Sequence, residues 1–400
     1  MERSDKALLA AFLVAAGLGT LGHCLLVNDG AVFVAASWLG NAWDLYFRQV
    51  ASRAVSTYLE FGPAQLVLRM APLSASAFDR LVHVLYFAAP LALWFCLRTI
   101  EPHRVFSRLY LAVVLALLYF PSEGIVAVGV WLIWLALASD ARRGFGQVAM
   151  ATALLGVTLV FTHPALAVMT VLYGVVGAGL RALGRPVPRQ SLYAAAALFV
   201  ILLAGNLIVS RLLPPTNPLI SAALASGRQA YLDPLGLVTE IGRFPAIAVL
   251  WLLLLGPGLF GRFRPASFVV LAIIGLWFAA AGTNLLTYLA ARHTALYVLA
   301  VAVTLALAAP NLWLKNAERN FMLYAAIAAT AAVSYASDLL LFERYVDRRL
   351  VPGFVNVETL TPERWPQPVL KTSLAHMLFK WGAEPDYVRD VVCRPMTGIA

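Results

Sequence analysis

Long apolar stretches alternate with short polar connectors along most of this 400-residue chain. Each stretch approaches the roughly 20 apolar residues that an α-helix needs to cross the hydrocarbon core of a bilayer. Eleven stretches can be marked, and together they predict an all-α, polytopic membrane protein. They cover residues 7–27, 81–97, 106–120, 124–139, 146–162, 165–183, 191–211, 244–260, 266–282, 291–309 and 321–341.

The composition agrees with this interpretation, because 61% of the residues are hydrophobic and only 12% are charged. A soluble domain carries about 25% charged residues. The net charge of +10 does not indicate a nucleic-acid partner, because most of the positive charge falls in connectors between spans. Charge in such connectors is explained by the positive-inside bias and by anionic lipid headgroups. The Ala-, Leu- and Arg-rich composition and the short loops predict a bacterial inner membrane.

Basic residues recur in every second connector, and cytoplasmic connectors are the ones that retain positive charge. We therefore predict a cytoplasmic N-terminus and, after an odd number of crossings, a periplasmic C-terminus. The predicted organisation is a transmembrane bundle over 1–341, with a first extracytoplasmic loop at 28–80, and a C-terminal extracytoplasmic segment at 342–400 with one amphipathic helix near 368–382. The basic connectors hold Arg98 with Arg104, Arg142 with Arg143, Arg181 with Arg185 and Arg189, Arg262 with Arg264, and Lys315 with Arg319.

Two carboxylates mark the predicted outer face. Asp29 directly follows the first span, where it can reach a substrate at the membrane surface. Glu123 lies in the short turn Pro121-Ser122-Glu123 between two spans. The same turn is typical of a helix start, with Ser122 as the cap and Glu123 placed favourably against the helix dipole. Both interpretations of Glu123 remain open.

The first outer loop is rich in aromatic and basic residues. Apolar residues interleave with Arg48 and Arg53 and predict an amphipathic segment that lies on the membrane. An interfacial aromatic belt explains this pattern. The functional alternative is that Arg48 or Arg53 on this surface holds a lipid phosphate by bidentate contacts. Asp44, in the same loop, is a further acidic candidate for the site.

Two later positions add basic candidates. His163 lies in the turn Thr162-His163-Pro164, where it either hydrogen-bonds within the turn or acts as a ligand or base. Arg292 and His293 begin the tenth span from the predicted outer side. An arginine there runs against the positive-inside bias, so we expect either a phosphate partner or snorkelling to lipid headgroups.

Other chemistry has little support. The chain contains no nucleotide-binding glycine motif, so ATP hydrolysis is not indicated. The three cysteines, at 24, 96 and 393, lack metal-ligand spacing. We expect no certain cofactor, and a divalent metal ion assisted by Glu123 stays open because the scattered carboxylates define no metal site.

Taken together, these residues resemble the GT-C superfamily of integral membrane glycosyltransferases. That family combines a helical bundle with an acidic motif just beyond span one and a further carboxylate in the next outer loop, positions matched here by Asp29 and Glu123. The start of span ten, at Arg292, resembles the Arg-Tyr-x-x-x-Pro-like start of a late span in that family. The chain departs from the family pattern because no second acid adjoins Asp29 and the late motif lacks its tyrosine and proline.

The resemblance implies a sugar donor carried on a polyprenyl phosphate and an extracytoplasmic glycan, lipid or protein acceptor. Asp29 would then be the general base, and Arg292 with Arg48 or Arg53 would balance the charge of the phosphate leaving group. Glu123 would position the acceptor. An envelope polysaccharide polymerase or ligase and a noncatalytic transporter or scaffold are the alternatives.

Overall fold

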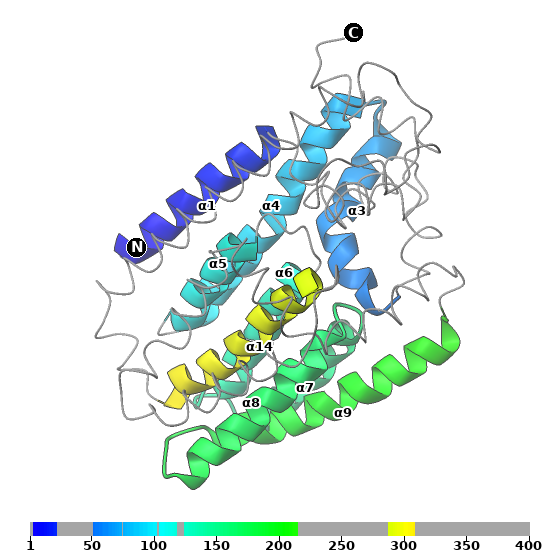
Figure 1. Ribbon diagram of the computed structural model, residues 1–400. Helices are drawn as coiled ribbons and strands as arrows, with labels where there is room; N and C mark the ends of the chain where they lie inside the picture. The colour runs from blue at the N-terminus through cyan, green and yellow to red at the C-terminus, as the bar shows by residue number, and fades with distance from the viewer. Residues whose placement is uncertain are drawn as a thin grey trace.

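The computed structural model describes residues 3–21, 51–73, 75–101, 104–117, 124–214 and 287–308. These ranges are almost entirely helical and contain no strand, so the all-α prediction is confirmed for them. Figure 1 labels the α-helices α1 (Arg3–Leu21), α3 (Ala54–Met70), α4 (Ala75–Ile100), α5 (Val105–Leu117), α6 (Gly124–Ser139), α7 (Phe145–Val160), α8 (Ala165–Ala182), α9 (Arg189–Leu212) and α14 (Thr287–Ala308). A short 3-10 helix, η3 (Ala51–Arg53), precedes α3.

A helix lies at eight of the eleven predicted spans. The predicted spans 244–260, 266–282 and 321–341 lie outside the described residues, as does the predicted helix at 368–382. Three described helices are long and apolar enough to cross a membrane. A membrane protein is therefore supported, while the number of eleven spans stays a prediction. The three helices run over Arg80–Ile100, Ala165–Ala182 and Arg189–Leu212.

Helix α6 occupies the centre of the described bundle. Thirteen of its 16 residues are buried, as expected for a helix that is apolar on all sides. Two tryptophans fix it to its neighbours through their ring N–H groups. Trp131 donates to Thr170 of α8, and Trp134 donates to Thr152 of α7, each at 3.1 Å.

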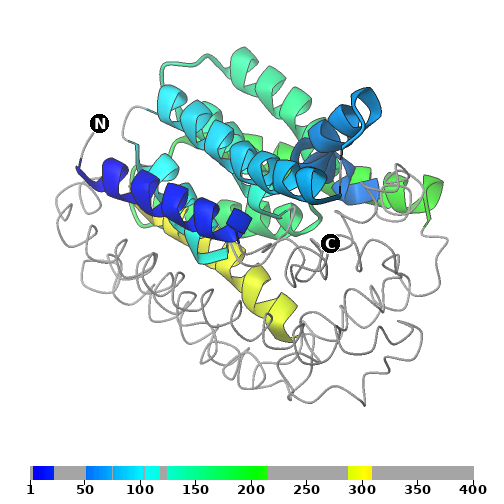
Figure 2. The same ribbon diagram turned by 90° about the horizontal axis from the view of Figure 1, so that it is seen from above.

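Successive helices from α4 to α7 run in alternating directions, because short connectors join neighbours that pack side by side. Helix α1 runs alongside α4 in both views (Figures 1 and 2). The side-chain amide of Gln190 donates to the carbonyl oxygen of Asp140 at 2.9 Å. The α4–α5, α6–α7 and α8–α9 connectors therefore share one end of the bundle, which we call the connector end.

Helix α14 packs along α8. A Cβ atom added at Gly177 would lie 3.5 Å from Cγ2 of Thr304. Both residues lie in the last third of their helices, so α8 and α14 run in the same direction. Their N-terminal ends consequently lie opposite the connector end.

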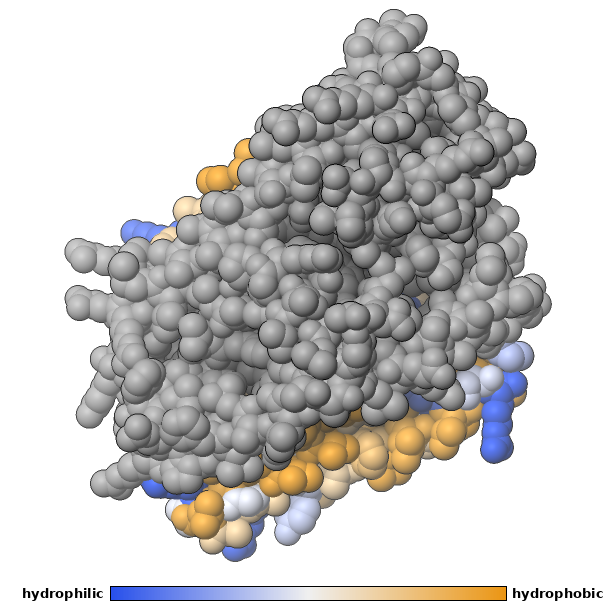
Figure 3. Space-filling view, viewed as in Figure 1, coloured by the Kyte–Doolittle hydropathy of each residue, from blue (hydrophilic) through white to orange (hydrophobic). Residues whose placement is uncertain are grey.

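Helices α7, α8 and α9 expose large apolar side chains. The described surface in Figure 3 shows an apolar band with hydrophilic residues at its two ends. Helix α9 has 24 residues, about 36 Å, which exceeds the roughly 30 Å of a bilayer core. Exposed arginines, Arg189 and Arg211, flank it. This arrangement is what helices surrounded by lipid require. The exposed apolar residues of α7, α8 and α9 include Leu154, Val157, Val175, Val200, Leu207 and Ile208.

Candidate functional site

Two segments that the sequence placed on the outer face meet at the end opposite the connector end. The backbone N–H of Val55 donates to the carbonyl oxygen of Phe161 at 2.8 Å. The hydroxyl of Ser56 donates to the carbonyl oxygen of Thr162 at 2.6 Å, across 106 positions of sequence. The start of α3 is thus fixed to the turn between α7 and α8.

Two predicted site residues flank this junction. Arg53 ends η3, and its carbonyl oxygen accepts hydrogen bonds from Ser56 at 3.1 Å and Thr57 at 3.0 Å. His163 is buried, and its Nδ1 accepts the backbone N–H of Ala165 at 3.1 Å. An accepting Nδ1 assigns the ring hydrogen of a neutral imidazole to Nε2. The turn hydrogen bond anticipated for His163 is present, and a role in ligand binding stays a prediction.

Glu60 is a buried carboxylate that the sequence analysis did not select. Helix α3 buries polar side chains together with Phe61 against the bundle and exposes several large apolar side chains. The predicted contact of an amphipathic segment with the membrane surface stays a prediction, because Arg48 and much of that segment lie outside the described residues. Buried residues are Ser56, Thr57, Glu60 and Gln65, and exposed ones are Tyr58, Leu59, Leu66 and Met70.

The remaining predicted site residues divide into two groups. Arg292 and His293 belong to the second turn of α14, which begins at the same end as the His163 turn. The structure thus brings the segments of Arg53, His163 and Arg292 to one end of the bundle. The other candidates lie outside the described residues, namely Asp29, Asp44, Arg48 and Glu123.

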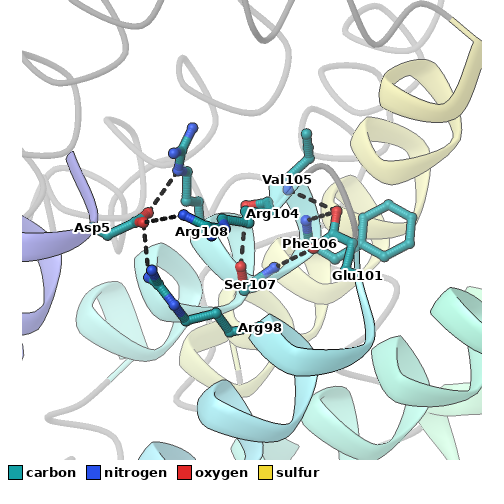
Figure 4. Close-up of polar contacts among 8 residues, drawn as sticks. All are labelled: Asp5, Arg98, Glu101, Arg104, Val105, Phe106, Ser107 and Arg108. Carbon is teal, nitrogen blue, oxygen red and sulfur yellow. Dashed lines mark hydrogen bonds and ion pairs between the residues drawn. The ribbon is translucent and has the colours of Figure 1, made fainter. Parts of the chain in front are cut away.

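The connector end holds a cluster of three arginines around Asp5 (Figure 4). Asp5 lies 2.8 Å from Arg98, 2.8 Å from Arg108 and 3.9 Å from Arg104. Burial alone would raise the pKa of Asp5, but hydrogen bonds and charges from Arg108 and Arg98 outweigh it and hold the pKa below its usual value. The cluster ties α1 to α4 and α5. The start of α1 and the first basic connector therefore lie at the same end, as the predicted topology requires.

Glu101 caps α5 beside this cluster. Its Oε1 accepts the backbone N–H groups of Val105 at 2.7 Å and Phe106 at 2.8 Å, and its Oε2 accepts that of Ser107 at 3.1 Å. These N–H groups belong to the first turn of a helix, where no backbone partner exists. Burial raises the pKa of Glu101 to about 7, although the three N–H groups and Arg108 favour the charged form.

Within the described residues, no group of three or more His, Cys, Asp or Glu side chains could hold a metal ion. No family model matches the chain, and neither a curated protein nor a solved structure matches it. The described part is therefore classified by its architecture alone. It is all-helical and contains helices able to span a membrane.

Proposed function

We propose that this protein is an integral membrane glycosyltransferase that moves a sugar from a polyprenyl-phosphate donor to an extracytoplasmic glycan, lipid or protein acceptor. The observation that carries the proposal is the junction between the Arg53 segment and the His163 turn. Arg53 and His163 come from sequence segments more than a hundred positions apart. Both lie beside this junction, at one end of the helical bundle. Binding sites are commonly assembled from loops that a rigid scaffold positions in this way.

The proposed chemistry assigns three tasks. Asp29 takes the proton of the acceptor hydroxyl, with Asp44 as the next candidate for this role. Arg292, with Arg48 or Arg53, balances the negative charge of the departing polyprenyl phosphate, because a guanidinium binds phosphate through two parallel hydrogen bonds. Glu123 positions the acceptor, and His163 and His293 contribute hydrogen bonds.

A transfer assay on the purified protein tests the base. Labelled polyprenyl-phosphate hexoses and pentoses serve as donors, with membrane lipid extract as the acceptor source. Asp29→Asn should lower transfer by about 100-fold or more, the usual contribution of a general base, and should leave the melting temperature unchanged. Asp140→Asn is the matched control, because it makes the same change in a turn at the connector end.

Two results would contradict the proposal. Parental transfer by Asp29→Asn would remove Asp29 as the base and make Asp44 the next residue to replace. If the parental protein transferred label from none of the donors, the glycosyltransferase class itself would be wrong. An envelope polymerase or ligase would instead show transfer only when a preformed polysaccharide is the acceptor.

Buried Glu60 favours a transporter as the second candidate. Ionisable side chains inside a helical membrane bundle commonly mark ion or substrate pathways. Proteoliposomes holding a pH-sensitive dye would report proton uptake driven by a membrane potential. Transport predicts uptake that Glu60→Gln abolishes and Asp29→Asn leaves intact, whereas the glycosyltransferase proposal predicts no uptake in any variant.

A further inference from the structure

The cluster around Asp5 brings three guanidinium groups within 4 Å of one carboxylate. The nearby carboxyl of Glu101 accepts hydrogen bonds from backbone N–H groups of α5, and its charge interacts with Arg108. Among the described residues, Arg104 is the arginine of the cluster that Asp5 holds least closely.

The three arginines differ in their attachment to Asp5. Arg98 and Arg108 approach it at 2.8 Å, and their side chains are 17% and 9% exposed. The Arg104 side chain is 38% exposed, and its closest nitrogen lies 3.9 Å from the carboxylate. Because this distance is too long for a hydrogen bond, Asp5 does not engage the N–H donors of Arg104. These donors lie at the outer edge of the cluster.

The backbone of Arg104 has an uncommon conformation. Its φ of 54° lies in the left-handed region, where a residue with a side chain is strained. Residues held in such conformations often belong to binding sites. Here the conformation occurs where the connector turns into α5, and it coincides with the approach of the guanidinium to Asp5 (Figure 4).

Exposed apolar side chains follow the cluster along α1 and α4. The exposed face of α1 begins with Lys6, one residue after Asp5, and continues with apolar residues at helical spacing. Phe95 of α4 is also exposed and lies one turn before Arg98. Cationic side chains at the end of an apolar helix face suit the headgroup level of a bilayer. The apolar residues on α1 are Leu13, Val14 and Leu18.

We propose that Arg104, supported by Arg98, binds the phosphate of an anionic phospholipid whose acyl chains lie along α1 and α4. The half-exposed guanidinium of Arg104, which Asp5 does not hydrogen-bond, favours a lipid with a net negative headgroup over a zwitterionic one. The exposed apolar residues beside the arginines favour a lipid over a soluble phosphate. This binding site is separate from the proposed sugar-transfer chemistry, because it lies at the opposite end of the bundle.

Lipid-dependent thermal stability of the purified, delipidated full chain tests the site. Phosphatidylglycerol, phosphatidylcholine and glycerol phosphate are titrated separately, and the melting temperature is followed. Phosphatidylglycerol should raise it to a plateau, and the other two should not. Arg104→Asn should weaken the phosphatidylglycerol midpoint at least fivefold, because asparagine accepts left-handed backbone readily but lacks the guanidinium.

Arg142→Asn is the matched control. Arg142 also lies at the connector end and contacts an aspartate, Asp140, but its side chain is 73% exposed in a turn. Its phosphatidylglycerol midpoint should equal that of the parent. Arg104→Lys should give an intermediate midpoint, since lysine keeps the charge without the bidentate fork, and it serves as the second variant if Arg104→Asn does not fold.

Three results would overturn the inference. An unchanged midpoint in either Arg104 variant would remove Arg104 from the site. Equal stabilisation by phosphatidylcholine would show that the headgroup charge is irrelevant. Equal stabilisation by glycerol phosphate would assign the arginines to a soluble phosphate instead. Loss of the phosphatidylglycerol effect at high salt would support the inference, because exposed charges are screened there.

Discussion

Glu101 shows how one buried carboxyl can support a helix start in either charge state. Its Oε1 accepts the two shorter hydrogen bonds, at 2.7 Å from Val105 and 2.8 Å from Phe106. Its Oε2 accepts the longest, at 3.1 Å from Ser107. A proton on Oε2 would therefore cost the weakest of the three bonds, so most of the cap survives protonation.

We expect the contribution of Glu101 to stability to fall as the pH rises. Burial raises its pKa from an ordinary 4.5 to about 7, so the folded chain binds this proton more tightly than the unfolded chain does. The stabilisation is fully present below pH 4.5 and is lost as the pH rises through 7. Its upper limit is about 3 kcal/mol. Melting curves of the parent and Glu101→Gln between pH 5 and 8 test this, because glutamine does not ionise.

The difference between the two proteins isolates this group, since other titrating groups are common to both. Glu101→Gln should gain stability relative to the parent as the pH rises. A constant difference across the range would contradict the raised pKa of Glu101. A difference that moved in favour of the parent would mean that the charged cap is the stabilising form.

Buried acids were the residues that sequence reasoning could not identify. Asp5, Glu60 and Glu101 lie beside or between apolar stretches, where acids ordinarily face water. Asp5 is buried because Arg98 and Arg108 reach it from 93 and 103 positions away. Such contacts depend on helix packing and leave no local pattern. For Glu60, the spacing of Ser56, Thr57 and Glu60 signals a polar helix face, but not that it points inward.

The packing of one helix against another depends on how closely their backbones can approach. Helices α7 and α9 meet at Gly205, where an added Cβ would lie 2.8 Å from Cγ1 of Val160. Small residues allow helix backbones to approach closely in membrane proteins. Gly205→Ala should lower the melting temperature, because overpacking costs about 1–3 kcal/mol and exceeds the roughly 1 kcal/mol by which alanine improves helix propensity.

Gly174→Ala supplies the control for this prediction. Gly174 also lies inside a helix, α8, but in the described part of the chain no atom beyond its own helix backbone and chain neighbours lies within 4 Å of the position its Cβ would take. This variant should melt at the parental temperature or above it. If both alanine variants raised the melting temperature equally, the close approach of α7 and α9 at Gly205 would be wrong.

Sequence patterns predicted where these helices lie along the chain better than which face of each helix is buried. Helix α6 runs over Gly124–Ser139, as the apolar stretch between Glu123 and Asp140 predicted. Helix α3 buries both polar side chains, such as Ser56 and Glu60, and the aromatic side chain of Phe61. The pattern does not say which face meets the bundle, because a polar interior and an apolar exterior produce the same spacing as the reverse. Ser56 settles the choice through its hydrogen bond to Thr162.

Contacts between distant helices show which connectors lie together at each end of the molecule. The connector end gathers the start of α1 and the connectors with Arg98, Arg142 and Arg185, all of which the sequence assigned to the cytoplasm. The start of α3 and the His163 turn, assigned to the outer face, meet at the opposite end. The packing therefore agrees with the predicted grouping of connectors. It does not depend on which end faces the cytoplasm.

The distribution of positive charge indicates which end faces the cytoplasm. We expect the connector end to be cytoplasmic because it carries the arginines. Alkaline phosphatase, which folds only where its disulfides form, should be inactive when fused after Arg142 or Gly184 and active after His163 or Ala400. A cytoplasmic reporter should give the opposite pattern. Activity after Arg142 and Gly184 with none after His163 would invert the molecule and leave its helix packing intact. Activity after Arg142 but not after Gly184 would contradict the packing itself, because Gln190 and Asp140 place these two connectors side by side.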